Sequence, residues 1–179
     1  MFQEIISPMM EISLTIETEK AGLFFQLLEQ GFFVAVPEGT SVRKTLCDYL
    51  DISGEYLENR IQTIFLDGKP VDDVDGAYVR KGSVIALSAA MPGLVGSTMR
   101  KGGYLAAFRS GISQKKESIP DLGRTADVTV KLFNLVAKDL GTRLLERGIR
   151  IPANRLNELL LNQDIVFRVK TGADSISRD

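Results

Sequence analysis

The chain has 179 residues, of which 44% are hydrophobic and 25% charged, and its formal net charge is −1. These values are typical of a folded globular protein and argue against a disordered or membrane-embedded chain. Histidine is absent, which excludes the commonest general base, the Ser-His and Cys-His nucleophile pairs, and imidazole-bound zinc. We therefore expect no catalytic residues, no metal and no other cofactor, and we predict that the chain is not an enzyme.

Two features bear on the compartment. No basic residue precedes Lys20, so the positively charged start of a secretory signal is missing. Cys47 is the sole cysteine, which fits a reducing environment. We expect a cytoplasmic protein, and we interpret Cys47 as a small, half-buried thiol because no histidine can activate it.

The first elements follow from periodicity and turn residues. Apolar and polar residues alternate over residues 11–17, which predicts a strand. Residues 22–30 carry leucines at helical spacing and are followed by Gly31, a typical helix stop. Residues 32–36 are rich in strand-forming side chains, and the Pro-Glu-Gly run at residues 37–39 predicts a turn after them.

Caps and a hairpin dominate the next segment. Thr40 or Ser41 can cap one short helix, and Ser53 can cap a second. The Asp-Gly pair at residues 67–68 is a strong signal for a two-residue hairpin. Residues 83–87 predict a further short strand.

From residue 91 glycine becomes frequent, and every charged residue between 96 and 116 is basic. The cations of this basic segment can meet an acidic protein or follow a phosphate backbone. A net charge of −1 favours the first use or a solvated linker over nucleic-acid binding. The candidate binding residues are Arg100, Lys101, Arg109, Lys115 and Lys116.

Beyond the basic segment the pattern returns to regular elements. Residues 128–132 alternate as a strand, and leucines at helical spacing predict one helix that ends at Gly148 and another around residues 156–160. Residues 165–169 predict a last strand, and we expect the end of the chain, residues 172–179, to be frayed.

Three segments resemble the β-grasp sulphur-carrier family, the small ubiquitin-like proteins of molybdopterin and thiamine biosynthesis. Residues 36–42 lead from a turn into a helix, residues 65–71 form the hairpin, and residues 79–87 form the closing strand. The resemblance covers about residues 11–96. It implies a β-grasp-like domain there.

In that family the last strand runs into a free carboxy-terminal Gly-Gly, whose carboxylate is adenylated and converted to a thiocarboxylate. Here residues 90–93 occupy the equivalent exit, and the nearby pair Gly102 and Gly103 is internal. The resemblance therefore implies carrier chemistry only if the chain is cleaved after Gly103.

Residues 50–71, followed by residues 81–85, also resemble the alpha-L RNA-binding motif, in which two short helices precede a hairpin. RNA affinity depends on cations that meet phosphates. Residues 40–90 contain eight carboxylates against six cations, which argues against RNA. The six cations are Arg43, Lys44, Arg60, Lys69, Arg80 and Lys81.

The sequence thus predicts an α+β protein with a β-grasp-like domain over residues 11–96, a glycine-rich basic linker over residues 97–126 and a smaller α+β part over residues 127–171. The function that we expect is a non-enzymatic protein-interaction or assembly module, which binds a protein partner or itself and no membrane. An exposed sheet edge and the basic segment are its candidate contact surfaces. The alternatives are a sulphur-carrier precursor and an alpha-L-type RNA-binding protein.

Overall fold

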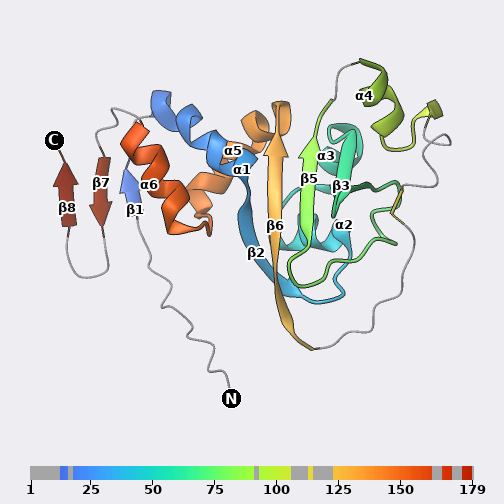
Figure 1. The fold of residues 1–179 in the computed structure, drawn as a ribbon, viewed down its shortest axis with the longest axis horizontal. Helices are drawn as coiled ribbons and strands as arrows, with labels where there is room; N and C mark the ends of the chain where they lie inside the picture. The colour runs from blue at the N-terminus through green and yellow to red at the C-terminus, as the bar shows by residue number, and fades with distance from the viewer. Residues whose placement is uncertain are drawn as a thin grey trace.

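The structure is a computed structural model. It describes residues 13–15, 18–90, 93–105, 113–114, 123–162, 167–170 and 175–178. It is an α+β fold, as predicted (Figure 1). The elements in chain order are β1 (Ser13–Thr15), a 3₁₀ helix (Thr18–Phe24), α1 (Phe25–Gln30), β2 (Phe32–Pro37), α2 (Val42–Lys44), a π-helical turn (Thr45–Tyr49), α3 (Gly54–Asn59), β3 (Thr63–Leu66), β4 (Lys69–Pro70), β5 (Val84–Ser88), α4 (Gly93–Met99), β6 (Thr125–Phe133), α5 (Leu135–Arg147), α6 (Ala153–Asn162), β7 (Phe167–Lys170) and β8 (Ser175–Arg178).

Several helices and turns form where local sequence signals predict them. The Ser41 hydroxyl accepts a hydrogen bond from the Lys44 amide at 3.2 Å and caps α2, and the Ser53 hydroxyl accepts one from the Tyr56 amide at 3.1 Å and caps α3. The hairpin between β3 and β4 turns at residues 67–68, where both φ angles are positive, as a tight two-residue turn requires. These predictions are confirmed.

The larger sheet has five strands in the order β2-β6-β5-β3-β4. Strand β6 is antiparallel to β2 and parallel to β5, and β3 is antiparallel to both β5 and β4. Because all but the first two residues of β6 lie beyond the predicted linker of residues 97–126, the sheet combines strands from both sides of that linker. A strand from the carboxy-terminal part therefore lies inside the sheet and not beside it.

A second sheet has three strands in the order β1-β7-β8. The predicted first strand is described at Ser13–Thr15, and it pairs with β7 in this small sheet rather than joining the larger one. Strand β8 occupies Ser175–Arg178, where the sequence predicted a frayed end. Residues Gly93–Met99, where glycine becomes frequent and no helix was predicted, form α4.

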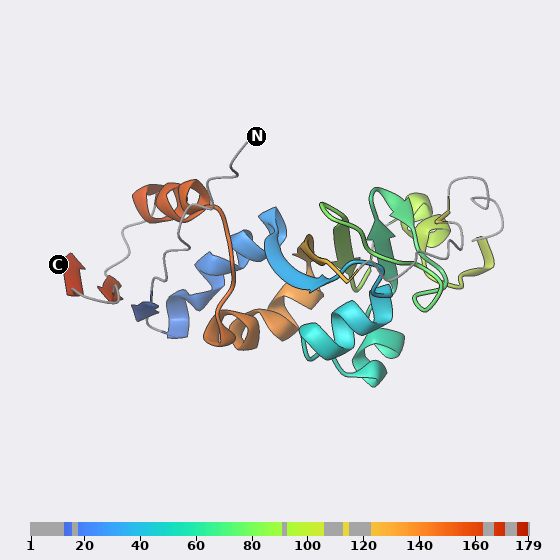
Figure 2. The same ribbon diagram turned by 90° about the horizontal axis from the view of Figure 1, so that it is seen from below.

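One face of the five-stranded sheet is fully covered by helices. On β6 the side chains of Ala126, Val128, Val130 and Leu132 are at most 1% exposed, as the alternating pattern of that strand requires. Helices α2, α3 and α5 lie on this side of the sheet (Figure 2). Among the described residues, no helix has the length and apolar character needed to cross a bilayer.

The main core contains residues from both sides of the predicted linker. Leu46 of the π-helical turn, Leu57 of α3 and Val136 of α5 are fully buried in the same cluster as Ile85 of β5 and Leu132 of β6. The two parts of the chain therefore share one hydrophobic core. Phe24, Leu27 and Leu159 form a smaller cluster near the amino-terminal helices and α6.

The buried position of β6 yields a stability prediction. Leu132→Ala should lower the free energy of unfolding by about 2–5 kcal/mol, because it leaves a cavity at a fully buried site. Thr125→Ala, at an exposed position of the same strand, should change it by less than about 0.5 kcal/mol. Urea unfolding measures both. A small loss for Leu132→Ala, equal to that of the control, would show that β6 is not part of the core.

Candidate interaction surface

The structure describes two of the five cations of the basic segment. Arg100 is exposed, whereas the side chain of Lys101 is only 14% exposed. The Lys101 ammonium donates to the Leu57 carbonyl at 3.2 Å and to the Glu58 carboxylate at 3.0 Å. Lys101 thus holds α3 and is not oriented toward a partner. Arg109, Lys115 and Lys116 lie outside the described residues.

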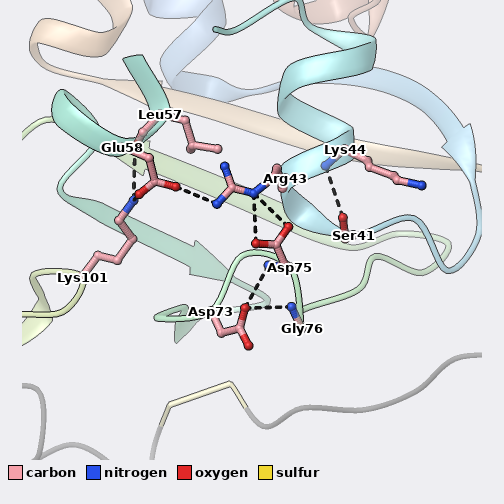
Figure 3. Close-up of polar contacts among 9 residues, drawn as sticks. All are labelled: Ser41, Arg43, Lys44, Leu57, Glu58, Asp73, Asp75, Gly76 and Lys101. Carbon is pink, nitrogen blue, oxygen red and sulfur yellow. Dashed lines mark hydrogen bonds and ion pairs between the residues drawn. The ribbon is translucent and has the colours of Figure 1, made fainter. Parts of the chain in front are cut away.

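Lys101 is one end of a chain of ion pairs (Figure 3). Arg43 on α2 lies between Glu58 on α3, at 2.6 Å, and Asp75, in the acidic loop of residues 72–75, at 2.8 Å. The hydrogen bonds from Arg43 and then from Lys101 lower the pKa of Glu58. Each exposed pair contributes little alone, but the chain joins α2, α3, the acidic loop and the turn after α4.

The pair Gly102 and Gly103 lies in the turn that this chain of ion pairs holds. The Lys101 amide donates to the Gln62 carbonyl at 2.6 Å, the Gly102 amide to the Asp72 carboxylate at 3.3 Å and the Gly103 amide to the Arg100 carbonyl at 3.1 Å. Gly102 has a φ of 61°, which glycine tolerates best. The Gly-Gly pair is therefore a hydrogen-bonded turn against the protein and not an extended tail.

The acidic loop has internal partners. Asp73 accepts hydrogen bonds from the amides of Asp75 and Gly76, at 3.1 and 3.0 Å, which fixes the turn (Figure 3). Within the part of the chain that the structure describes, no group of three or more Cys, Asp or Glu side chains is arranged to hold a metal ion.

Cys47 lies half-buried beside this region. Burial raises the pKa of the thiol, and the positive charge of Arg43 offsets that only in part. At neutral pH Cys47 is thus a protonated thiol and a weak nucleophile. This agrees with its interpretation from the sequence.

A polar hollow of about 530 Å³ lies beside α2. Its lining has three carboxylates, one ammonium and two phenol rings, so it suits a cationic group better than a phosphate. The lining residues are Pro37, Glu38, Gly39, Thr40, Ser41, Lys44, Asp48, Tyr49, Asp75 and Tyr78.

A further polar contact fixes α3 against α5. The Tyr56 hydroxyl donates to the Asp139 carboxylate at 2.9 Å, and Arg60 approaches the same carboxylate at 3.3 Å. Burial, and then the bond to Asp139, raises the pKa of Tyr56 to about 12. The helices behind the sheet are thus joined to one another by side-chain bonds as well as by the core.

The two edges of the larger sheet are partly occupied. On the outer side of β2 the Phe33 amide donates to the Arg150 carbonyl at 2.7 Å, and Pro37 at the end of the strand has no amide hydrogen to offer. On β4 the Pro70 carbonyl accepts from the Gln114 amide at 2.8 Å. Bonds of this kind reduce the ability of an edge to pair with another strand.

The face of the sheet that points away from α2, α3 and α5 carries several apolar side chains that are not fully buried. We call it the open face. Helices α4 and α6 lie toward opposite ends of the sheet, not over the middle of this face (Figures 1 and 2). Its central side chains are half-buried, and most are apolar: Phe33, Phe65, Val84, Ala86, Thr129 and Lys131.

Strand pairing brings these six residues together. Thr129 lies between Phe33 on β2 and Val84 on β5. In the next row Ala86 lies between Lys131 on β6 and Phe65 on β3. The sequence analysis missed this surface, although the apolar residues on both faces of residues 32–34 and 63–66 are its signal.

The structure predicts that Lys101 fixes the turn at Gly102 and Gly103. Lys101→Met keeps the apolar stem but removes both ammonium bonds, so opening of the turn should become easier by about 1 kcal/mol. Hydrogen exchange of the residue 101 amide, measured by NMR, should then be about fivefold faster. Lys44→Met removes a cation that makes no side-chain bond to a described residue, and should leave that amide unchanged.

The same turn should respond to acid. Because the folded-state pKa of Glu58 lies below its ordinary value, the stabilisation from its pairs is complete above about pH 4.3 and is lost as the pH falls through the lowered pKa. The effect should stay under about 1 kcal/mol, since Glu58 is 47% exposed.

Equal exchange of the residue 101 amide in Lys101→Met and in the unsubstituted chain would contradict the role of Lys101.

Comparisons of the chain with protein-family models, with curated proteins and with solved structures found no match.

Proposed function

We propose that this chain is a non-enzymatic protein-interaction module that binds its partner through the open face. The observation that carries the proposal is that the side chains on the two faces of one sheet differ in burial. Helices bury one face completely, whereas Phe33, Phe65 and Val84 keep part of their apolar surface in water on the other. Partly exposed apolar side chains gathered on one face of a sheet are typical of a contact surface.

The arrangement of strands supports a β-grasp-like character for the module. In a β-grasp sheet the first strand lies in the middle, antiparallel to the second strand and parallel to the last. Here β6 has that position between β2 and β5 with those directions. The proposal is therefore a β-grasp-like sheet in which the strand that usually comes first follows the others in the chain.

The sulphur-carrier alternative receives less support. It needs a free carboxylate at Gly103, and Gly103 precedes β6 in the chain. Cleavage there would leave the central strand of the sheet held by non-covalent contacts alone. The hydrogen bonds of Lys101 and Gly102 would also have to open before the tail could reach an enzyme.

The RNA-binding alternative also lacks a favourable observation. Arg60, in the region that resembles the alpha-L motif, is paired with a carboxylate of the same chain, and so are Arg43 before that region and Lys101 beyond it. Cations neutralised in this way release few counterions from a phosphate backbone.

The proposal predicts where a partner lies. A photoreactive benzoylphenylalanine at Ala35, an exposed position on the open-face side of β2, should give a discrete cross-linked product when the protein is expressed in its native host. The same group at Glu55, on the helix-covered side, should give none. Absence of a product from Ala35, or a product from Glu55 alone, would contradict an interaction through the open face.

A further inference from the structure

The charges on the open-face side of β6 are arranged symmetrically about its central residue. Asp127, Thr129 and Lys131 follow one another at two-residue intervals, so all three point to this side of the sheet. Thr129 has the apolar neighbours Phe33 and Val84. An acid and a base thus lie at equal distances on the two sides of a small central residue.

This arrangement is complementary to itself. When two copies meet face to face, a two-fold axis that runs across the strands at Thr129 makes the two β6 strands antiparallel, and it brings Asp127 opposite Lys131 of the second copy. The row Phe33, Thr129 and Val84 then meets the same row of the other copy. An axis along the strands would instead place like charges together, which electrostatics disfavours.

The Asp127 carboxylate and the Lys131 ammonium can each form an ion pair with a second copy. Lys131 has no ion-pair partner among the residues that the structure describes. Asp127 accepts two hydrogen bonds from Arg150, each at 2.9 Å, but its side chain stays 52% exposed. A carboxylate has about four acceptor positions, so Asp127 can bind Arg150 of its own chain and an ammonium from outside.

We propose that the open face binds the open face of a second copy of this chain, as a two-fold dimer with Thr129 on the axis. The inference rests on the proposed function and names its partner. In such an isologous contact each residue near the axis meets its own copy. The two sheets would pack about 10 Å apart, as in β-sandwiches, with Asp127 and Lys131 as reciprocal ion pairs at its sides.

Sedimentation equilibrium over a wide concentration range tests the two-fold symmetry of this dimer. The unsubstituted chain should show a monomer–dimer equilibrium. Thr129→Arg and Thr129→Glu should each be monomeric, because like charges then meet on the axis. An equimolar mixture of the two variants should again form a dimer, since the axis then joins Arg to Glu. Glu55→Arg, on the opposite side, should dimerise as the unsubstituted chain does.

Several outcomes would overturn the dimer. A chain that is monomeric at every concentration would do so, and so would a dimer that neither Thr129 variant weakens. Loss of the dimer in both variants without recovery in the mixture would exclude the axis at Thr129. Circular dichroism checks that the variants fold. If they do not, Lys131→Asp, which places two acids opposite each other, should weaken the dimer by the same argument.

The cross-link at Ala35 separates this inference from the proposed function. A product with twice the mass of the chain supports both. A product with a different protein, together with a monomeric chain, would overturn the dimer but leave the open face as an interaction surface. No product at all would contradict the proposed function itself.

Discussion

The pairing of β6 with β2 on one side and β5 on the other is the interaction on which the rest of the structure depends. It joins the part of the chain after residue 123 to the part before residue 91 through backbone hydrogen bonds along the strand. Its inward side chains fill the core beneath α2, α3 and α5, and its outward side chains form the centre of the open face. One strand therefore determines both the stability of the fold and its candidate contact surface.

The long connection between β5 and β6 follows from this arrangement. Parallel neighbours cannot be joined by a tight turn, so the chain has to return to the other end of the sheet. The beginning of that path, from α4 to Gly103, is held against α3 and the acidic loop by Lys101 and Asp72. We infer that these contacts restrict where the connection can run and keep the first part of the basic segment on the protein.

The contacts of the basic segment also change its interpretation. A run of cations without acids suggests a binding surface when only the sequence is considered. Lys101, however, finds its carboxylate on α3, more than forty residues away in the chain, and such a long-range pair leaves no mark in the local pattern. Charge complementarity within the fold thus accounts for one of the predicted binding residues.

Much of the local structure was predictable from the sequence because its causes are local. The caps at Ser41 and Ser53, the Asp-Gly hairpin and the alternation of β6 depend on residues within a few positions of each other. The partners of the strands were not predictable in this way. Alternation at Ser13–Thr15 and at β6 looks alike, yet one strand joins the small sheet and the other the centre of the large one.

The open face was missed for a related reason. Phe33 and Phe65 belong to segments that are apolar on both faces, which indicates a strand but does not show which side the helices cover. The sequence predicted no helix over residues 93–99, where glycine becomes frequent, yet these residues form α4. The contacts that decide which face is covered come from helices in other parts of the chain.

The central claim is that residues on both sides of the connection form one cooperative unit around β6. Native-state hydrogen exchange in low concentrations of urea tests it most directly. The amides of Val130 on β6 and of Ala86 on β5, which faces Phe65 of β3, should exchange with the same free energy, equal to that of global unfolding. Exchange of Val130 through an opening of much lower free energy, while Ala86 stays protected, would show that β6 is an appendage and contradict the account.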